Sequence, residues 1–311
     1  MKAGLRIHHF AIAFYFVFRL IASNVSAQEL EPRAYWISPI GTNGVYFIYA
    51  HSRGEFVPDP SLPVADVDAR VHSSFLGYYR SLDFFGRSAN VTFTVPYYWG
   101  STIKGKVEEE FQDIRRSGLA DPNLRLSVNL LGAEAMTPPE FQEFRKDPPT
   151  ILGASIRIQP PLGQYDPSRV VNLGTNRWSF KPQIGLLQPV RKRFAIEMSL
   201  GAWFFADNKE FLGTTKKQSP LLSGEFNFVW RIRPAFWASL DTTFYYGGRT
   251  TVGDELRSDL QRNSRIGGTF AVPFGGRHVL KFSASSGFFV SFGGNYDTFA
   301  VSYQYGWISG N

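Results

Sequence analysis

The stretch from Asn295 to Trp307 alternates between two kinds of side chain for longer than any other part of the chain. Every second residue from Phe299 to Trp307 is large and apolar or aromatic, and the residues between them are small or hydrogen-bonding. A repeat of two residues predicts a β-strand whose two faces meet different surroundings. The same alternation recurs along most of the chain, so the sequence predicts an all-β protein.

The N-terminus has the pattern of an export signal. Lys2 and Arg6 precede an apolar run at residues 10–18, and the small-residue sequence Val25-Ser26-Ala27 follows. This order predicts a secretory signal peptide over residues 1–27. A retained anchor is the alternative, but the run is shorter than the roughly 20 residues that span a bilayer as a helix. We therefore expect one domain over residues 28–311.

Composition narrows the class of protein. The chain has no cysteine, which excludes disulfides and a cysteine-linked lipid anchor. The signal peptide holds three of the 33 basic residues, so the remaining chain has 30 basic and 26 acidic residues and a net charge of +4, which does not call for a nucleic-acid partner. Aromatic residues make up 16% of the chain, and no later apolar run is long enough for a membrane helix. These features favour a bacterial outer-membrane β-barrel.

The alternation predicts twelve strands of an antiparallel up-and-down barrel. They fall at residues 44–52, 70–82, 90–99, 124–130, 152–159, 177–186, 194–204, 222–230, 236–244, 265–274, 280–285 and 295–307. The first is bulky on both faces, so its orientation stays open. Most connections alternate between tight turns and long polar loops, as expected for periplasmic turns and external loops. Residues 28–43 are expected to be a polar lead-in on the periplasmic side.

Three local patterns predict departures from plain strands and turns. Thr137-Pro138-Pro139-Glu140 predicts a capped short helix that runs through Arg145. Val107, Phe111 and Ile114 have helical spacing in the loop at 100–121, which predicts an amphipathic helix, either over a pore mouth or exposed. Pro182 would remove a ladder hydrogen bond, so a bulge is expected there.

Charged residues fall on the face opposite the apolar one. In a soluble sandwich they would face water, but closure into a membrane barrel removes free edges and makes the aromatic strand ends into interfacial girdles. In a twelve-stranded barrel these residues would line a narrow lumen, partly plugged by side chains or an inward loop. They are candidates for a substrate path, or alternatively ion pairs that stiffen the wall. The candidates are Arg125, Arg157, Arg177, Lys181, Glu197, Glu225, Asp241, Arg265 and Lys281.

Several stretches of the chain resemble the meta-pathway (MetA-pathway) phenol-degradation family of outer-membrane barrel transporters. They are GTNG at 41–44, LGYYRSLDFFGRSANVT at 76–92, SGLADPNLRLSVNLLG at 117–132, LGQYDP at 162–167, NLGTNRWSFKP at 172–182 and DLQRNSR at 259–265. The resemblance implies uptake of aromatic compounds and provides no catalytic or binding residues to carry over. The expected partners are outer-membrane lipid, small hydrophobic or aromatic solutes, and the outer-membrane insertion machinery.

These observations favour a channel for passive uptake of small hydrophobic or phenol-type compounds. The alternative is a non-transporting structural or adhesive barrel that acts through its external loops. An enzyme is disfavoured because only His51, His72 and His278 follow the signal peptide, with no nucleophile elbow and no metal-ligand spacing. We expect no catalytic residue, no metal and no cofactor.

Overall fold

The computed structural model describes residues 31–309 apart from 56–60, 62–63, 108–109, 234 and 293–294. The predicted signal peptide lies outside the described residues. No helix in the part of the chain that the structure describes is long and apolar enough to cross a membrane.

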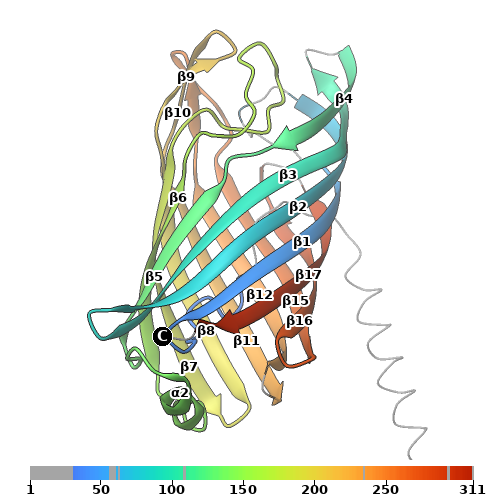
Figure 1. Cartoon of the computed structure of the whole chain (residues 1–311). Helices are drawn as coiled ribbons and strands as arrows, with labels where there is room; N and C mark the ends of the chain where they lie inside the picture. Colours follow the sequence, from blue (N-terminus) through green and yellow to red (C-terminus); the bar gives the residue numbers. More distant parts are fainter. Residues whose placement is uncertain are drawn as a thin grey trace, which may run out of the picture.

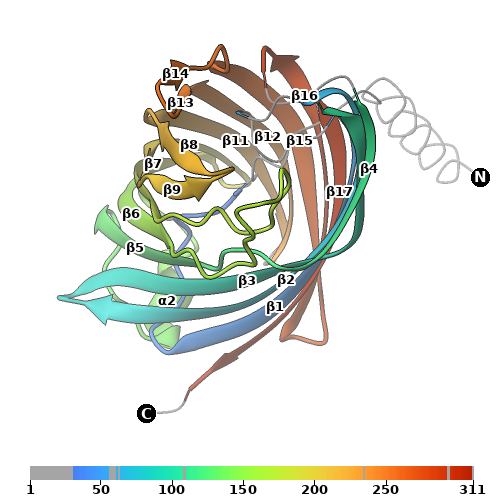
Figure 2. The same cartoon turned by 90° about the horizontal axis from the view of Figure 1, so that it is seen from above.

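Twelve strands form a closed antiparallel barrel, as predicted (Figures 1 and 2). The strand β1 pairs on one side with β2 and on the other with the last strand, β17, and this pairing closes the wall. The wall strands are β1 (Thr42–Gly54), β2 (Val64–Phe84), β3 (Arg87–Val107), β5 (Asn123–Leu131), β6 (Ile151–Gln159), β7 (Ser179–Arg191), β8 (Phe194–Phe205), β11 (Leu221–Arg233), β12 (Phe236–Gly247), β15 (Gln261–Phe274), β16 (His278–Val290) and β17 (Tyr296–Ile308).

The outer surface of the wall is apolar. Each wall strand carries at least one large apolar side chain that is 37 to 63% exposed. The first strand, whose faces the sequence left open, places Val45 and Phe47 outward and Tyr46 inward. An apolar surface that encircles the molecule is far larger than a soluble protein exposes, and it matches the lipid-facing band of a membrane barrel. One residue from each strand is Phe47, Leu76, Phe93, Leu126, Ile156, Ile184, Leu200, Phe226, Leu240, Phe270, Phe282 and Phe299.

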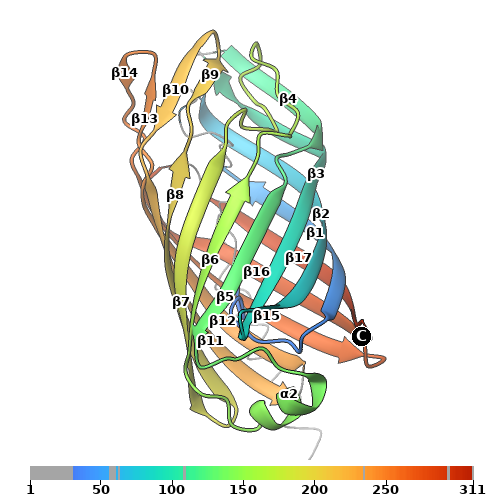
Figure 3. The ribbon, with the colours of Figure 1, turned by 60° about the vertical axis from the view of Figure 1, so that its left-hand side comes forward.

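The two ends of the barrel differ in their connections (Figures 1 and 3). Tight turns at one end join β2 to β3, β7 to β8, β11 to β12 and β15 to β16. The same end holds the helix α2 (Pro138–Phe144), where the backbone N–H and hydroxyl of Thr137 both donate to Glu140 over 2.7 Å. The predicted helix is thus confirmed. By the usual asymmetry of such barrels this end is periplasmic and the end with long loops is external.

The predicted helix in the loop at 100–121 is wrong. That segment is a β-hairpin in which β4 (Glu110–Leu119) continues the pairing of β3, with Ile103 opposite Ile114. Helical spacing of a few apolar residues is weak evidence when a neighbouring strand offers a continuous ladder. The loops at 207–219 and 247–262 also contain strands: β9 (Asn208–Phe211), β10 (Thr214–Gln218), β13 (Thr250–Val252) and β14 (Glu255–Leu256) form a separate small sheet.

The bulge expected at Pro182 is also absent. Phe180 pairs with Phe204 and Gln183 pairs with Gly201, so β7 and β8 keep the same register on both sides of the proline. The missing N–H of Pro182 interrupts the ladder without inserting a residue. The register shift on this strand pair instead lies between Pro189 and Arg191, next to the tight turn.

Candidate functional site

The predicted charged residues form a basic and an acidic arc on the inner surface of the wall. Arg125, Arg157 and Lys181 are register partners across β5, β6 and β7. On the adjoining strands β8, β11 and β12, Glu197 and Asp241 occupy one row on either side of Asn227. The inner surface therefore has cations on β5, β6 and β7, and carboxylates on the adjoining strands β8 and β12.

The remaining candidates occupy three different positions. Glu225 lies on the inner face of β11, two residues from Asn227. Lys281 pairs with the buried Ala271 on the inner side of the wall, and Arg265 is 1% exposed and donates to Ser285. Arg177 lies in the loop before β7 instead of on the strand, and it donates to Gln218 in β10.

The N-terminal segment, residues 31–41, enters the lumen and joins the two arcs. Glu31 forms an ion pair with Arg157 and donates its backbone N–H to Glu225 over 2.7 Å. The backbone N–H of Arg33 donates to Glu197 over 2.6 Å. The segment lies at the periplasmic end, as predicted, but it is a plug inside the barrel instead of a lead-in, and it is held by residues more than a hundred positions away in the chain.

Tyr35 anchors the plug against the wall. Its hydroxyl lies 3.1 Å from that of Ser155, and the guanidinium of Arg125 lies 5.1 Å from its ring. Two glycines make room for this ring, because an added Cβ at Gly153 or Gly185 would lie 2.3 or 2.0 Å from ring atoms. At such distances even an alanine collides with the tyrosine, so the wall is shaped to hold this side chain.

Trp36 and Ile37 connect the plug to the periplasmic end. Trp36 donates its indole N–H to Glu197, and the guanidinium of Arg33 lies 4.3 Å from its ring. Ile37 is 6% exposed and belongs to an apolar cluster against which Phe141 and Phe144 of α2 also pack. The helix in the long periplasmic connection thus covers the outer side of the plug.

A different structure narrows the external end. The segment between β6 and β7, residues 160–178, crosses the mouth of the barrel in the view from above (Figure 2). Asp121, 2% exposed, holds this cap: it accepts from the backbone N–H of Gly163 and from both the N–H and hydroxyl of Thr175, each over 2.7 Å. We use the term cap for residues 160–178 below.

An apolar cluster joins the cap to the extended wall. Val171 from the cap and Phe211 from β9 pack on inward-facing residues of β2 and β3, and Val170 is packed against them. Asn208 of β9 donates to Tyr165 and to the carbonyl of Thr175, over 2.9 and 3.1 Å. The cap is thus fixed to the wall by apolar contacts and to the small sheet by hydrogen bonds. The buried wall residues are Val67, Ala69, Val71 and Ile103.

Between the two ends, aromatic rings on β8 face cations. Arg177 lies 4.6 Å from the ring centroid of Phe205, and Lys181 lies 5.7 Å from that of Trp203. These two rings stack with centroids 6.4 Å apart. Neither Trp203 nor Phe205 was predicted from the sequence, although both fall on the same face of the alternation as Glu197, which could have indicated them.

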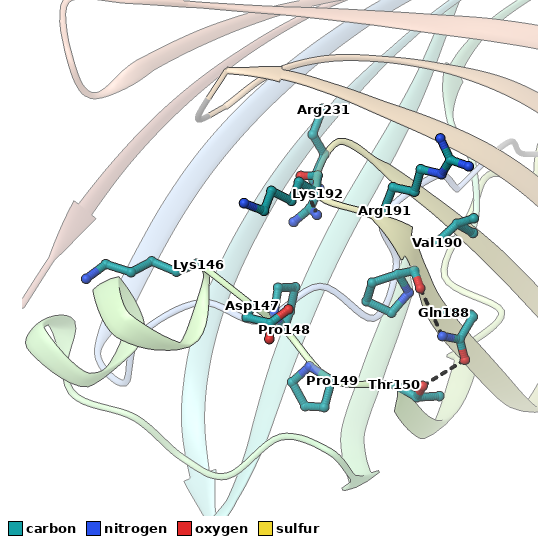
Figure 4. A pocket seen from close by; sticks show the side chains of 11 residues that line it. Lys146, Asp147, Pro148, Pro149, Thr150, Gln188, Val190, Arg191, Lys192 and Arg231 are labelled. Atoms are coloured by element: carbon teal, nitrogen blue, oxygen red, sulfur yellow. Dashed lines mark hydrogen bonds between the residues drawn. The ribbon is translucent and has the colours of Figure 1, made fainter.

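A cavity of about 310 Å³ opens at the periplasmic end (Figure 4). It lies between the segment after α2 and the turn from β7 to β8, with Arg231 at its edge. In Figure 4 the side chains of Lys192 and Arg231 lie near one another, whereas those of Lys146 and Arg191 point away. The guanidinium of Arg231 also lies 5.3 Å from the ring of Trp36, so the cavity adjoins the plug.

This architecture is that of a bacterial outer-membrane β-barrel: an apolar exterior, a polar interior and short turns at one end. The family described as "Putative MetA-pathway of phenol degradation" matches residues 47–307. The chain belongs to this family, in agreement with the resemblance seen in the sequence. No curated protein matches the chain.

Solved structures of similar fold are channels and transport barrels. The COG4313 outer membrane channel from Pseudomonas putida F1 has a TM-score of 0.75 and 16% identity, with 90% of this chain and 100% of that chain covered. The transport unit of the autotransporter AIDA-I from Escherichia coli has a TM-score of 0.50 and 10% identity, with 89% and 92% covered. The TodX monoaromatic hydrocarbon channel has a TM-score of 0.45 and 10% identity, with 88% and 91% covered.

In the part of the chain that the structure describes, no group of three or more His, Asp or Glu residues is placed to hold a metal ion. The described lumen presents charged groups, hydrogen-bonding groups and aromatic rings.

Proposed function

We propose that this protein is a passive outer-membrane channel for small aromatic compounds of the phenol type. The observation that carries the proposal is the row of aromatic rings and cations inside the lumen. Arg177 with Phe205 and Lys181 with Trp203 lie one after the other along β7 and β8. A solute with a flat ring can stack on such side chains, and ring–cation contacts contribute roughly 0.5–2 kcal/mol each.

The polar groups beside these rings suit a solute with a hydroxyl. Farther toward the periplasm on the same face of β8, the carboxylate of Glu197 accepts hydrogen bonds from the plug. Trp36 and Trp237 lie at this level, with the guanidinium of Arg33 4.3 and 5.2 Å from their rings. A phenol passing inward would stack on one aromatic side chain after another. Its hydroxyl would donate a hydrogen bond to the carboxylates beside these rings. The nine charged candidates of the sequence analysis act in this proposal as the polar wall of the path.

The plug closes the periplasmic end of the path. Residues 31–41 fill the lumen where the basic and acidic arcs meet. Their displacement is required for a solute to leave toward the periplasm. Their hydrogen bonds and ion pair can exchange with water and with a hydroxylated solute, and the packing of Tyr35 against the wall and of Ile37 against α2 adds to the contacts that displacement must break.

Uptake of phenol in a strain that lacks this protein tests the proposal. The strain is complemented with the wild-type protein, with the double variant Trp203→Leu and Phe205→Leu, or with Phe204→Leu. Phe204 lies on the same strand but is 47% exposed on the lipid side, so it is a matched control. Loss of two ring contacts is expected to slow phenol entry by about tenfold, and the control is expected to be unchanged. Equal entry with all three proteins would refute the proposal.

The second candidate function is a non-transporting structural or adhesive barrel. It is favoured by the small external sheet of β9, β10, β13 and β14, whose strands are hydrogen-bonded to each other and not to the wall. Planar bilayer recordings distinguish the two. A barrel that conducts neither with the plug nor without it would support the structural function.

A further inference from the structure

The outer surface of β1 changes character toward its external end. Val45 and Phe47 are 39 and 47% exposed, and Tyr49, His51 and Arg53 follow at the next outward positions. Rings of this kind mark the boundary between acyl chains and headgroups in membrane barrels. Arg53 therefore lies at the level of the headgroups in the external leaflet.

A second arginine lies directly opposite. Arg53 and Arg70 are register partners across β1 and β2, and both are exposed. Like charges in a cross-strand pair destabilise a sheet. Among the residues that the structure describes, neither guanidinium forms an ion pair. The described residues thus provide no ion pair to either guanidinium, although Asp297 of β17 is the register partner of Arg53 on its other side.

Four rings form a platform beneath the two arginines. The hydroxyl of Tyr49 lies 2.9 Å from Nδ1 of His72. The ring of His72 lies 4.6 Å from that of His51 and 5.4 Å from that of Trp99, centroid to centroid. Packed rings hold this part of the outer surface in a fixed shape, and they offer a flat apolar face to the first methylene groups of a lipid.

The neighbouring basic residues are arranged differently. Lys104 and Arg115, on the β3–β4 hairpin, both lie near Asp113, at 3.6 and 3.9 Å. Each of these two cations therefore lies near a carboxylate of the protein. The pair of Arg53 and Arg70 differs because it combines opposed cations, no ion pair and a position just above the apolar band.

We propose that Arg53 and Arg70 bind a phosphate of the phosphorylated glycolipid that fills the external leaflet of bacterial outer membranes. Two guanidinium groups match the oxygens of a phosphate and remain charged at any physiological pH. The anion would remove the repulsion within the cross-strand pair, and the acyl chains would lie along the ring platform and the apolar wall. This site is on the lipid side and is independent of the proposed transport through the lumen.

Binding of lipid A that carries both phosphates to the purified barrel in detergent tests the inference, with native mass spectrometry as the readout. The double variant Arg53→Gln and Arg70→Gln is expected to bind about a hundredfold more weakly, since a charge-assisted contact of each guanidinium contributes roughly a factor of ten. Arg262→Gln is the control, because Arg262 is exposed on the outer surface at the external end of β15. Heat-modified mobility on gels verifies that each variant is folded.

Two further ligands distinguish recognition of the whole phosphorylated lipid from binding of lipid or phosphate alone. Lipid A without phosphates is expected to bind the wild-type barrel as weakly as the double variant binds the phosphorylated form. Inorganic phosphate at the same concentration is expected not to displace the lipid. Equal binding by wild type and double variant, an equal loss in Arg262→Gln, or full displacement by inorganic phosphate would each overturn the inference.

Discussion

The two ends of the lumen are narrowed by structures of opposite kind. At the periplasmic end the plug, residues 31–41, is held by hydrogen bonds and an ion pair with Glu197, Glu225 and Arg157, and by the apolar cluster around Ile37. At the external end the cap, residues 160–178, is joined to strands on both sides and held by the buried Asp121 and an apolar cluster. Removal of the predicted signal peptide would leave the plug joined to the wall on one side only, and such a segment can leave its site more easily than one joined on both sides.

This comparison assigns different roles to the ends. The cap is part of the fixed framework that shapes the external entrance. Under the proposed function, the plug is the element whose position would decide whether the lumen is open. Each of the following predictions separates these roles.

The largest effect is expected for Asp121→Ala. The substitution leaves the N–H of Gly163 and both donors of Thr175 without their acceptor in a buried setting, which costs roughly 4 kcal/mol. Hydrogen exchange in residues 163–175 should therefore accelerate about a thousandfold. Leu162→Ala, at a 71% exposed side chain of the same cap, is the control and should change exchange little. A small effect of Asp121→Ala would mean that the cap is not held as described.

A smaller effect is expected for Gly185→Ala, which places a Cβ 2.0 Å from the ring of Tyr35. Displacing this ring should weaken the plug by about 1–3 kcal/mol, seen as faster hydrogen exchange at residues 33–37 but not in the cap. Gly224→Ala is the matched control, since its nearest neighbour would be 3.9 Å away. In a Tyr35→Ala background the same substitution should have no further effect. An undiminished effect there would show that the strain lies elsewhere.

The next-largest effect on the plug is expected for Glu197→Gln. Its carboxylate accepts from the backbone N–H of Arg33 and the indole N–H of Trp36. Loss of the charge should weaken these bonds by about 1 kcal/mol in total, because charge-assisted hydrogen bonds are roughly twice as strong as neutral ones. Hydrogen exchange at residues 33–37 should accelerate about fivefold. Glu143→Gln, exposed on α2, should leave this exchange unchanged, and an equal response in both variants would speak against a specific contact.

The smallest effect concerns pH and α2, which covers the plug. Hydrogen bonds from the side chain and backbone of Thr137 lower the pKa of the Glu140 carboxyl from 4.5. A lowered pKa stabilises the folded helix above pH 4.5, and this contribution is lost as the pH falls through the pKa of the folded state. Protection from exchange at residues 140–144, corrected for the intrinsic pH dependence of amide exchange, should therefore fall on acidification below pH 4.5. The Glu140→Gln variant should show a flatter response, and identical profiles would contradict the role of the capping box.

The wall of the barrel was predictable because each residue's type depends on its immediate surroundings. Lipid on one side and a wet lumen on the other impose the alternation along each strand, so apolar residues such as Phe299 and Tyr303 can be assigned to the lipid side from the sequence. The same reasoning placed Arg125, Glu197 and Asp241 on the inner face. The helix α2 was predictable for the same reason, since Thr137 and Glu140 form a capping box within one turn.

The ends of the barrel were not predictable because their contacts join distant parts of the chain. Nothing near Tyr35 in the sequence indicates that Gly153 and Gly185 leave space for its ring. Asp121 sits in an ordinary turn sequence, and its partners come from the cap more than forty residues later. The strand β4 was mistaken for a helix because its pairing with β3 outweighs the local spacing of Phe111 and Ile114.

Single-channel conductance with and without the plug tests the central claim most directly. A refolded chain that begins at residue 28 is compared with one that begins at residue 41 in planar bilayers, after both are shown to be folded by heat-modified mobility on gels. If residues 31–41 close the periplasmic end, the shorter chain will conduct several times more strongly and with less fluctuation between levels. Equal conductance of the two folded chains would contradict the claim that this segment controls the lumen.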